Sequence, residues 1–189
     1  MRNLLSVIAV TAAMLTTPAL ANDYADQLTV LAKSKLQEIA HDANLKAAVM
    51  AQNTKTSGYD QGKVDALDKQ WRAEVDASDK PLITETLANS TSAYLKKVQE
   101  ASGGLFTEIF AMDAKGLNVG QSSVTSDYWQ GDEAKWQKTY SMGADAVHIS
   151  DVEEDESTQI FQSQVSIPVL GDDGKPIGAI TFGVNVEAL

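Results

Sequence analysis

Apolar residues recur every three to five positions at the start of the chain, from Asn22 to about Asn53. The stripe that they form consists of Leu28, Leu31, Leu36, Ile39, Ala43, Ala47 and Met50. This spacing predicts one long amphipathic helix. Asn22 or Asp23 is suited to cap it, because a short polar side chain accepts hydrogen bonds from the first unpaired amides of a helix.

Two further helices follow in the first half of the chain. Residues 54–62 have the composition of a loop, and the apolar spacing from Val64 to Val75 then predicts a second helix. Pro81 suits the first turn of a third helix. The helical pattern continues to Ser102-Gly103-Gly104, where glycine tolerates the left-handed conformation that ends a helix.

The period of the pattern changes to that of strands after Gly104. Four strands are predicted in two hairpins, and they are Leu105–Met112, Leu117–Ser122, Gln159–Leu170 and Lys175–Val186. Each hairpin has a glycine-containing turn, Asp113–Gly116 in the first and Gly171–Gly174 in the second. A short helix at Glu133–Tyr140 and a brief strand at Val147–Ile149 lie between the hairpins. Consecutive strands joined by tight turns predict an antiparallel sheet covered by the helices, hence a single α+β domain.

The first 21 residues have the pattern of a signal peptide. Arg2 precedes a mostly apolar stretch from Leu4 to Leu15, and Ala19-Leu20-Ala21 forms a small-x-small cleavage site. The alternative is a single membrane anchor, for which the apolar run is short. We therefore expect cleavage after Ala21, export to the periplasm without stable membrane insertion, and a mature domain of residues 22–189.

Charge and cysteine content exclude several classes of protein. The chain has 15 basic and 26 acidic residues, a net charge of −11, and no cysteine. The acidic balance repels nucleic acid and anionic lipid. The lack of cysteine excludes disulfides, thiolate zinc sites, iron–sulfur clusters and cysteine nucleophiles.

No catalytic motif stands out in the sequence. The GxSxG, HExxH, P-loop and GxGxxG patterns do not occur. His41 and His148 are the only histidines, and surface or structural roles are expected for both. The sequence thus predicts no enzyme and no cofactor, with a hydrolase that uses Asp127 or Asp132 as the alternative.

The acidic run from Asp151 to Ser157 allows two interpretations. Its carboxylates could hold Ca²⁺, but the spacing and glycine of an EF-hand do not occur in it. A solvated acidic loop is the other interpretation, and no metal site is predicted.

The segment from Thr125 to Trp136 places aromatic and acidic residues close together. Tyr128, Trp129 and Trp136 alternate there with Asp127 and Asp132. An apolar wall with a few polar groups is typical of a small-molecule pocket. The same tryptophans could instead fill the seam between helices and sheet.

Arg72 is the only arginine of the mature chain. A guanidinium group binds the carboxylate of a ligand well. The alternative is an ion pair with Asp68 or Glu74 on the same helix.

Four stretches carry a resemblance to a known family. They are MDAKGLNV (112–119), DYWQGDEAKW (127–136), QVSIPV (164–169) and GKPIGAI (174–180). In this order the chain resembles the Cache sensor domains, PAS-like PDC modules of bacterial chemoreceptors and histidine kinases, in their single-domain form.

The resemblance implies a small-molecule pocket between the sheet and the loops that follow the first hairpin. It places Asp127, Tyr128, Trp129, Asp132 and Trp136 at or near that pocket. Strand alternation puts Gln162 and Gln164 on the face opposite the apolar core, so that they face either ligand or solvent. With Arg72, these residues are the candidate ligand-binding set.

The function implied is that of a periplasmic, non-catalytic binding protein of the sensor type. Its ligand would be an amine, an amino acid or a carboxylate, since the acidic and aromatic residues favour a cation and Arg72 favours an anion. Family members are usually followed by a membrane helix and an output domain, whereas this sequence stops at Leu189 with neither. We therefore expect a free-standing protein that presents its ligand to a separate receptor. The alternative is an adaptor or homodimer formed through the helix at 22–53.

Overall fold

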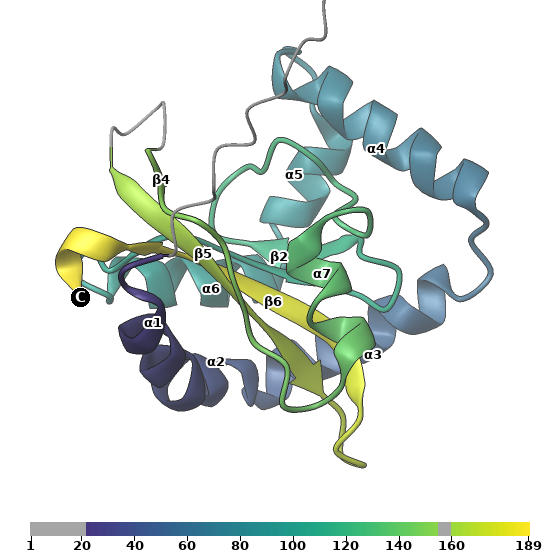
Figure 1. Ribbon diagram of the computed structural model, residues 1–189. Coiled ribbons are helices and arrows are strands. Elements are labelled where there is room, and N and C mark those ends of the chain that lie inside the picture. The colour runs from purple at the N-terminus through teal and green to yellow at the C-terminus, as the bar shows by residue number, and fades with distance from the viewer. Residues whose placement is uncertain (1–21, 155–159) are drawn as a thin grey trace, which may run out of the picture.

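The computed structural model describes residues 22–154 and 160–189 (Figure 1). The predicted signal peptide lies outside the described residues, as do Asp155 and Glu156 of the acidic run.

The first helical stretch is interrupted, so the prediction of one helix from residue 22 to 53 is wrong. Helix α1 (Ala25–Leu31) continues through a π-helical turn (Ala32–Leu36) into α2 (Gln37–Ala40), and α3 (Ala43–Thr56) then starts afresh. Between them Asp42 has φ −56° and ψ 130°, and its carboxylate accepts two 2.9 Å hydrogen bonds from backbone amides of the first turn of α3. The chain bends there because Asp42 caps a new helix.

Three more helices complete the first half of the chain. Helix α4 (Gln61–Val75) is the predicted second helix, and α5 (Pro81–Leu87) has proline in its first turn as expected. The predicted third helix does not continue to residue 102. It stops after α5, and Asn89 caps the separate helix α6 (Ser90–Glu100) by accepting a 2.8 Å hydrogen bond from an amide of the first turn.

The second half of the chain forms one antiparallel sheet. Its strands are β1 (Phe106–Met112), β2 (Asn118–Gln121), β3 (His148–Ile149), β4 (Glu153–Glu154), β5 (Phe161–Leu170) and β6 (Pro176–Asn185). Their order is β2-β1-β6-β5-β3, and β4 also pairs with β5. Both predicted hairpins are confirmed, β1 with β2 and β5 with β6. The last strand of the chain thus lies in the middle of the sheet.

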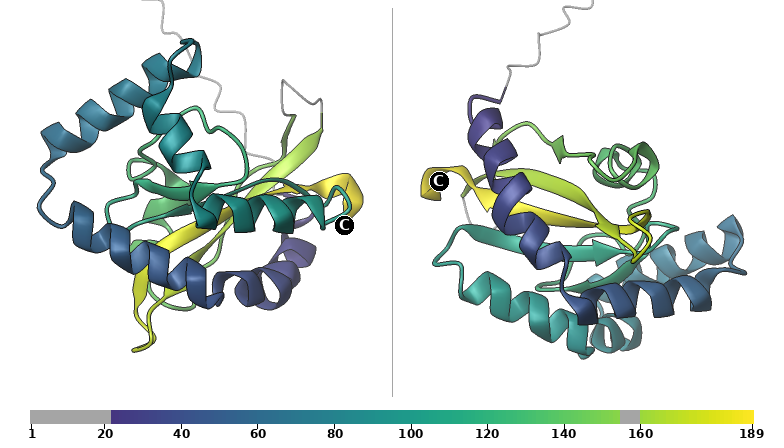
Figure 2. Two further views of the ribbon diagram at one scale, coloured as in Figure 1. Left: turned by 180° about the vertical axis from the view of Figure 1, so that it is seen from behind. Right: turned by 90° about the horizontal axis from the view of Figure 1, so that it is seen from below.

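Helices cover one face of this sheet, which confirms the predicted α+β class (Figure 2). The core between them is apolar, because alternate residues of each strand point to this face. Its buried members include Ile109, Val165, Ile167, Phe182 and Val184 from the strands, and Leu28, Leu36, Leu45, Val49 and Leu95 from α1 to α3 and α6.

The opposite face of the sheet is covered by the segment between the hairpins. This segment contains α7 (Ala134–Gln137) and a 3₁₀ turn at Tyr140–Met142. Trp136 and Tyr140 stack at 4.9 Å and pack against a small cluster formed by Phe110, Met112 and Ala179. Gln162 and Gln164 lie farther along the same face, at the other end of β5.

A second apolar cluster joins α4 and α5 to the edge of the sheet. Its buried members are Val64, Trp71, Ile83, Leu117 and Tyr128. No helix within residues 22–154 and 160–189 is both long enough and apolar enough to cross a membrane.

Two glycines let the loop after Tyr128 lie against the turn of the first hairpin. Gly116 has φ +82°, and a Cβ atom on it would come within 2.5 Å of the Cα of Gly131. A Cβ atom on Gly131 would come within 2.3 Å of the Trp129 ring nitrogen. Only glycine permits both the backbone conformation and this approach, and the contact fixes the segment that leads to α7.

Candidate functional site

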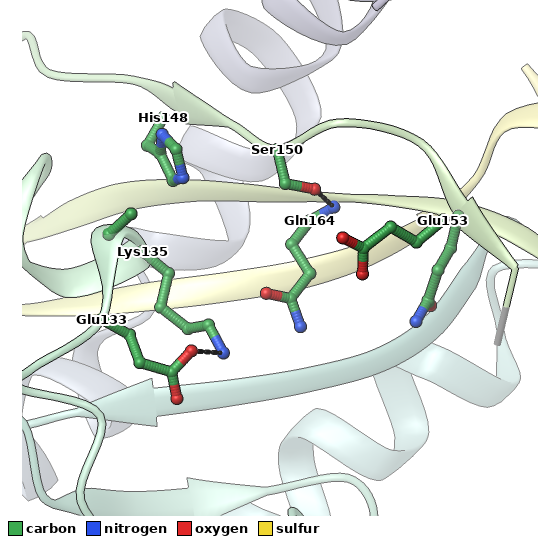
Figure 3. A pocket seen from close by; sticks show the side chains of 8 residues that line it. Glu133, Lys135, His148, Ser150, Glu153 and Gln164 are labelled. Carbon is green, nitrogen blue, oxygen red and sulfur yellow. Dashed lines mark hydrogen bonds and ion pairs between the residues drawn. The ribbon is translucent and has the colours of Figure 1, made fainter. Parts of the chain in front are cut away.

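A cavity of about 310 Å³ lies between α7, the short edge strands and the polar end of β5 (Figure 3). Its lining residues are Glu133, Ala134, Lys135, His148, Ser150, Glu153, Gln162 and Gln164. They come from three separate stretches of the sequence, which the sheet and α7 bring together.

Strand β5 supplies the floor of the cavity with two amide side chains. Gln164 donates a 2.8 Å hydrogen bond from Nε2 to Oε1 of Glu108 on β1, and Gln162 accepts one from the hydroxyl of Thr107. Both amides are therefore held by β1, across the intervening strand β6. The predicted alternation of β5 is confirmed, because Ser163 and Val165 are buried on the helix-covered face.

The edge strands supply the second wall. His148 pairs with Ser166 and Glu153 with Gln162 in the antiparallel register of β5. Ser150 exchanges hydrogen bonds with Gln164, since its amide donates to the Gln164 carbonyl at 2.9 Å and its Oγ accepts from the Gln164 amide at 2.8 Å. Ser150 thereby fixes the distance between this wall and the floor.

The third wall carries an ion pair. Lys135 Nζ lies 2.7 Å from Oε2 of Glu133, and the lysine side chain is only 14% exposed. Lys135 also donates to Oε1 of Gln130 at 3.2 Å and lies 5.5 Å from the ring centre of Phe110. A cation held by three partners has a fixed position and can bind an anionic group without further ordering.

His148 adds an imidazole ring whose surroundings favour its neutral form. Burial lowers the pKa of His148, and the positive charges of Lys138 and Lys135 lower it further. The charged residues that line the cavity are then Lys135 on one side and two carboxylates, Glu133 and Glu153.

The predicted ligand residues lie in three places. Gln162 and Gln164 line the cavity. Trp136 is in α7, next to the wall formed by residues 133–135, where its ring nitrogen donates to the Asp113 carbonyl at 3.1 Å. Asp132 is exposed and does not line the cavity.

Arg72 and Asp127 meet beside α4, outside this cavity. Arg72 Nε lies 2.7 Å from Oδ2 of Asp68, and its NH1 lies 2.8 Å from Oδ1 of Asp127. The pairing of Arg72 with Asp68, the alternative weighed from the sequence, is therefore present. The hydrogen bond with Asp68 raises the pKa of Arg72, and the charges of Asp127 and Asp132 add to the shift.

Tyr128 and Trp129 are held by the same carboxylate of α4. Their backbone amides donate to Oδ1 of Asp68 at 2.9 and 3.0 Å. The Tyr128 ring stacks on Trp71 at 5.3 Å, and Trp129 donates from its ring nitrogen to the Lys115 carbonyl at 2.8 Å. Both rings pack in the apolar cluster that joins α4 and α5 to the edge of the sheet. Trp129 therefore fills a seam between helices and sheet, which is one of the two interpretations derived from the sequence.

Five lining residues with polar side chains were not part of the candidate ligand-binding set. They are Glu133, Lys135, His148, Ser150 and Glu153. The last three follow from the pairing of residues 148–154 with β5, a register that no local pattern reveals. Glu133 and Lys135 belong to the aromatic and acidic segment from Thr125 to Trp136. The sequence pattern could therefore have indicated that they lie near the site.

The acidic run gives no metal site in the described part of the chain. No group of three or more histidine, aspartate or glutamate side chains is placed to hold an ion within residues 22–154 and 160–189. Asp155 and Glu156, which belong to the same acidic run, lie outside the described residues.

No family model matches the chain, and no curated protein matches it. Similar solved structures are sensor domains. The Vibrio cholerae histidine kinase DctB sensor domain is 13% identical over 86% of this chain and 54% of its own, with a TM-score of 0.41. The Campylobacter jejuni chemoreceptor Tlp3 sensory domain with isoleucine bound is 15% identical over 85% of this chain and 63% of its own, with a TM-score of 0.40.

The ligand-binding domain of the Pseudomonas aeruginosa chemoreceptor PctC in complex with GABA is also similar. It is 15% identical over 88% of this chain and 62% of its own, with a TM-score of 0.37. The chain thus spans between about half and two thirds of the length of these three domains. All three similarities are distant.

Proposed function

We propose that residues 22–189 form a non-catalytic, sensor-type domain that binds a small polar molecule in the 310 Å³ cavity. The observation that carries this proposal is the convergence of a half-buried lysine, two carboxylates and two fixed amides on one cavity. The volume lies at the lower end of the range typical of ligand pockets, about 300 to 1,000 Å³, so the ligand is small.

Among the three predicted ligand classes, an amino acid fits the charges best. Lys135 is positioned to bind a carboxylate, while Glu133 and Glu153 are positioned to bind an ammonium group. The amides of Gln162 and Gln164 supply both donors and acceptors. Lys135 and Glu133 already form an ion pair, so an amino acid would meet both charges of that pair, whereas an amine or a simple carboxylate would meet only one of them.

The hydrogen bonds of the only hydroxyl side chain in the lining support binding over catalysis. Ser150 Oγ donates to the Asp151 carbonyl at 2.8 Å and accepts from the Gln164 amide. Within the described residues it makes no hydrogen bond with His148, which activation of the hydroxyl would need. The Ser150 hydroxyl therefore donates to one backbone group and accepts from another, and both hydrogen bonds hold the structure of the wall.

The location and the partners of the domain are part of the same proposal. The signal-peptide pattern of residues 1–21 supports export to the periplasm. A separate receptor or a second copy of the chain would contact the helical side, where the side chain of Val30 on α1 is 69% exposed. Sedimentation at several concentrations tests the second copy.

A thermal-shift screen tests the binding proposal. The purified protein is heated with amino acids, amines, carboxylates, purines and divalent cations in separate wells. A ligand at one hundred times its Kd adds about 2.7 kcal/mol to the free energy of unfolding. This corresponds to a rise of roughly 5–10 °C in the midpoint for a domain of this size, and we expect it for one or more amino acids.

Paired variants locate the bound ligand. Lys135→Met and Gln164→Ala should reduce the shift given by an amino acid hit by more than half, because each removes a group that faces the cavity. Lys69→Met removes an exposed lysine of α4 and should leave it unchanged. An equal shift in all four proteins would contradict this site, and a screen without any amino acid hit would contradict the ligand class.

The other predicted ligand residues stay predictions and can enter the same assay. They are Asp127, Tyr128, Trp129, Asp132, Trp136 and Arg72. A loss of binding in Trp129→Ala, with the fold intact, would move the site toward α4.

A further inference from the structure

A second cavity of about 220 Å³ lies on the other side of the first hairpin, among α3, α4 and α5. The residues that matter for its chemistry are Tyr59, Leu67, Leu82, Tyr128, Lys55 and Glu85. It shares no lining residue with the cavity beside β5. It is therefore a separate place at which a molecule could bind, and it does not depend on the function proposed above.

The hydroxyl of Tyr128 is one of several polar groups that line this second cavity. Gln52, Thr56 and Gln70 line it as well, and each of them already donates a hydrogen bond within the protein. Tyr128 is only 8% exposed, and its ring is fixed by stacking on Trp71. Among the described residues its hydroxyl makes no hydrogen bond, although its backbone amide does. The hydroxyl is therefore free to donate a hydrogen bond to a molecule in the cavity.

The surroundings of Tyr128 decide which kind of partner fits. Burial raises the pKa of its hydroxyl far above the usual value, and the negative charges of Asp113 and Glu85 raise it further. The hydroxyl therefore stays protonated and can donate a hydrogen bond. The carboxylate of Asp113 disfavours an anion beside it, which points to an uncharged acceptor oxygen on the ligand.

The walls fit an apolar body of limited size. The rings of Tyr59 and Tyr128 and the side chains of Leu67 and Leu82 line the cavity, and all four belong to or pack on the cluster under α4 and α5. Lys55 and Glu85 lie 3.7 Å apart as an exposed ion pair, so their charges already offset each other. An apolar cavity of about 150 Å³ is large enough for benzene, so 220 Å³ leaves room for one ring with a small substituent.

We propose that the cavity among α3, α4 and α5 is a second binding site, for a small uncharged aromatic molecule whose carbonyl or hydroxyl oxygen accepts a hydrogen bond from Tyr128. The ring would contact the side chains of Leu67 and Leu82, and its oxygen would accept from the Tyr128 hydroxyl.

A nuclear magnetic resonance titration of the purified protein tests this site, with benzamide as the probe. Benzamide has one ring and one carbonyl oxygen. We expect saturable shifts of the backbone amide signals near Tyr59, Leu67 and Leu82, without shifts at Lys135 and His148. Gln164→Ala, in the other cavity, should leave the titration unchanged.

Comparison of two probes isolates the hydroxyl. Tyr128→Phe removes only the oxygen and should weaken benzamide binding about fivefold to tenfold, the effect of one neutral hydrogen bond. Toluene has the ring without an acceptor, so its affinity should be the same for the variant and the unchanged protein. A loss of similar size for both probes, or for neither, would overturn the role of Tyr128.

The cavity itself is tested by filling it. Leu82→Trp should abolish the shifts caused by both probes, and the spectrum without a probe shows whether this variant is folded. If it is not, the Tyr128→Phe comparison still decides the proposal. Shifts confined to the cavity beside β5, or no saturable shift at millimolar benzamide, would overturn it.

Discussion

At His148, burial and two neighbouring lysines act in the same direction. All three lower the pKa of the imidazole below its ordinary value of 6.5, which the unfolded chain retains. As the pH falls through this value, the unfolded state takes up a proton before the folded state does. Stability is therefore complete above pH 6.5 and decreases as the pH falls below it.

This predicts a pH-dependent effect of the substitution His148→Gln. Between about pH 7.5 and pH 5, the urea midpoint of the unchanged protein should fall more than that of the variant, because the variant has no imidazole to protonate at this position. Urea unfolding at both pH values measures it, with equal urea dependence of the free energy of unfolding as the check that the variant unfolds alike. An identical fall in both proteins would show that His148 does not contribute.

Among the secondary-structure elements, helix α4 anchors a neighbouring loop through one carboxylate. Asp68 accepts two backbone amides, at Tyr128 and Trp129, with one oxygen and the Arg72 side chain with the other. Asp68→Ala should lower the free energy of unfolding by about 2–4 kcal/mol, because two largely buried amides lose their acceptor. Thermal or urea unfolding measures this loss.

A matched variant separates the hydrogen bonds from the charge. Asp68→Asn keeps a carbonyl oxygen for the two amides and loses the charge that pairs with Arg72, whose side chain is 57% exposed. It should therefore cost only about 0.5–1 kcal/mol. If both variants were equally unstable, the ion pair rather than the amides would hold the loop.

The boundaries of the helices show what a pattern of apolar residues can and cannot predict. The 3.6-residue period identifies the helical first half, but it continues across Asp42 and Asn89 without a break. The helices on both sides of Asp42 face the same core, whereas α5 and α6 on either side of Asn89 pack in two different clusters. The break is decided by a short polar side chain that accepts amides of the next helix. Such residues also occur inside helices, so the sequence alone does not mark these two as caps.

Strand β5 shows a success of the same reasoning, and its neighbours show the limit. A period of two is enough to place Gln162 and Gln164 on the face opposite the core. His148 and Ser150 line the cavity only because two-residue strands pair with β5. Strands that short have no period of their own, so their side chains could not be assigned to a face.

At the scale of the whole molecule, both cavities depend on contacts between distant parts of the chain. The segment from Tyr128 to Lys135 contributes its first residue to one cavity and its last to the other. Its position depends on the close approach of Gly116 and Gly131 and on Asp68 of α4. The sequence singled out this segment as part of a pocket, and its role in ligand binding stays a prediction. The division of its residues between two cavities follows from tertiary contacts that the sequence does not reveal.

The position of β6 predicts how the sheet depends on the last part of the chain. Strand β6 pairs with β1 on one side and β5 on the other, and it supplies Ile180, Phe182 and Val184 to the core. A chain that ends at Gly174 should therefore be unfolded in circular dichroism and amide exchange. Addition of the peptide 175–189 should restore exchange protection in β1 and β5, and a folded spectrum without the peptide would contradict this view.

The same strand sets an order of events during protein synthesis. The ribosome makes every core-facing helix before β6, so the apolar stripes of α1, α3 and α6 emerge while the centre of the sheet does not yet exist. Pairs such as Phe106 with Val184 join residues far apart in the sequence, and contacts of this kind form slowly. The nascent chain therefore stays open and accessible to chaperones until synthesis has passed Asn185.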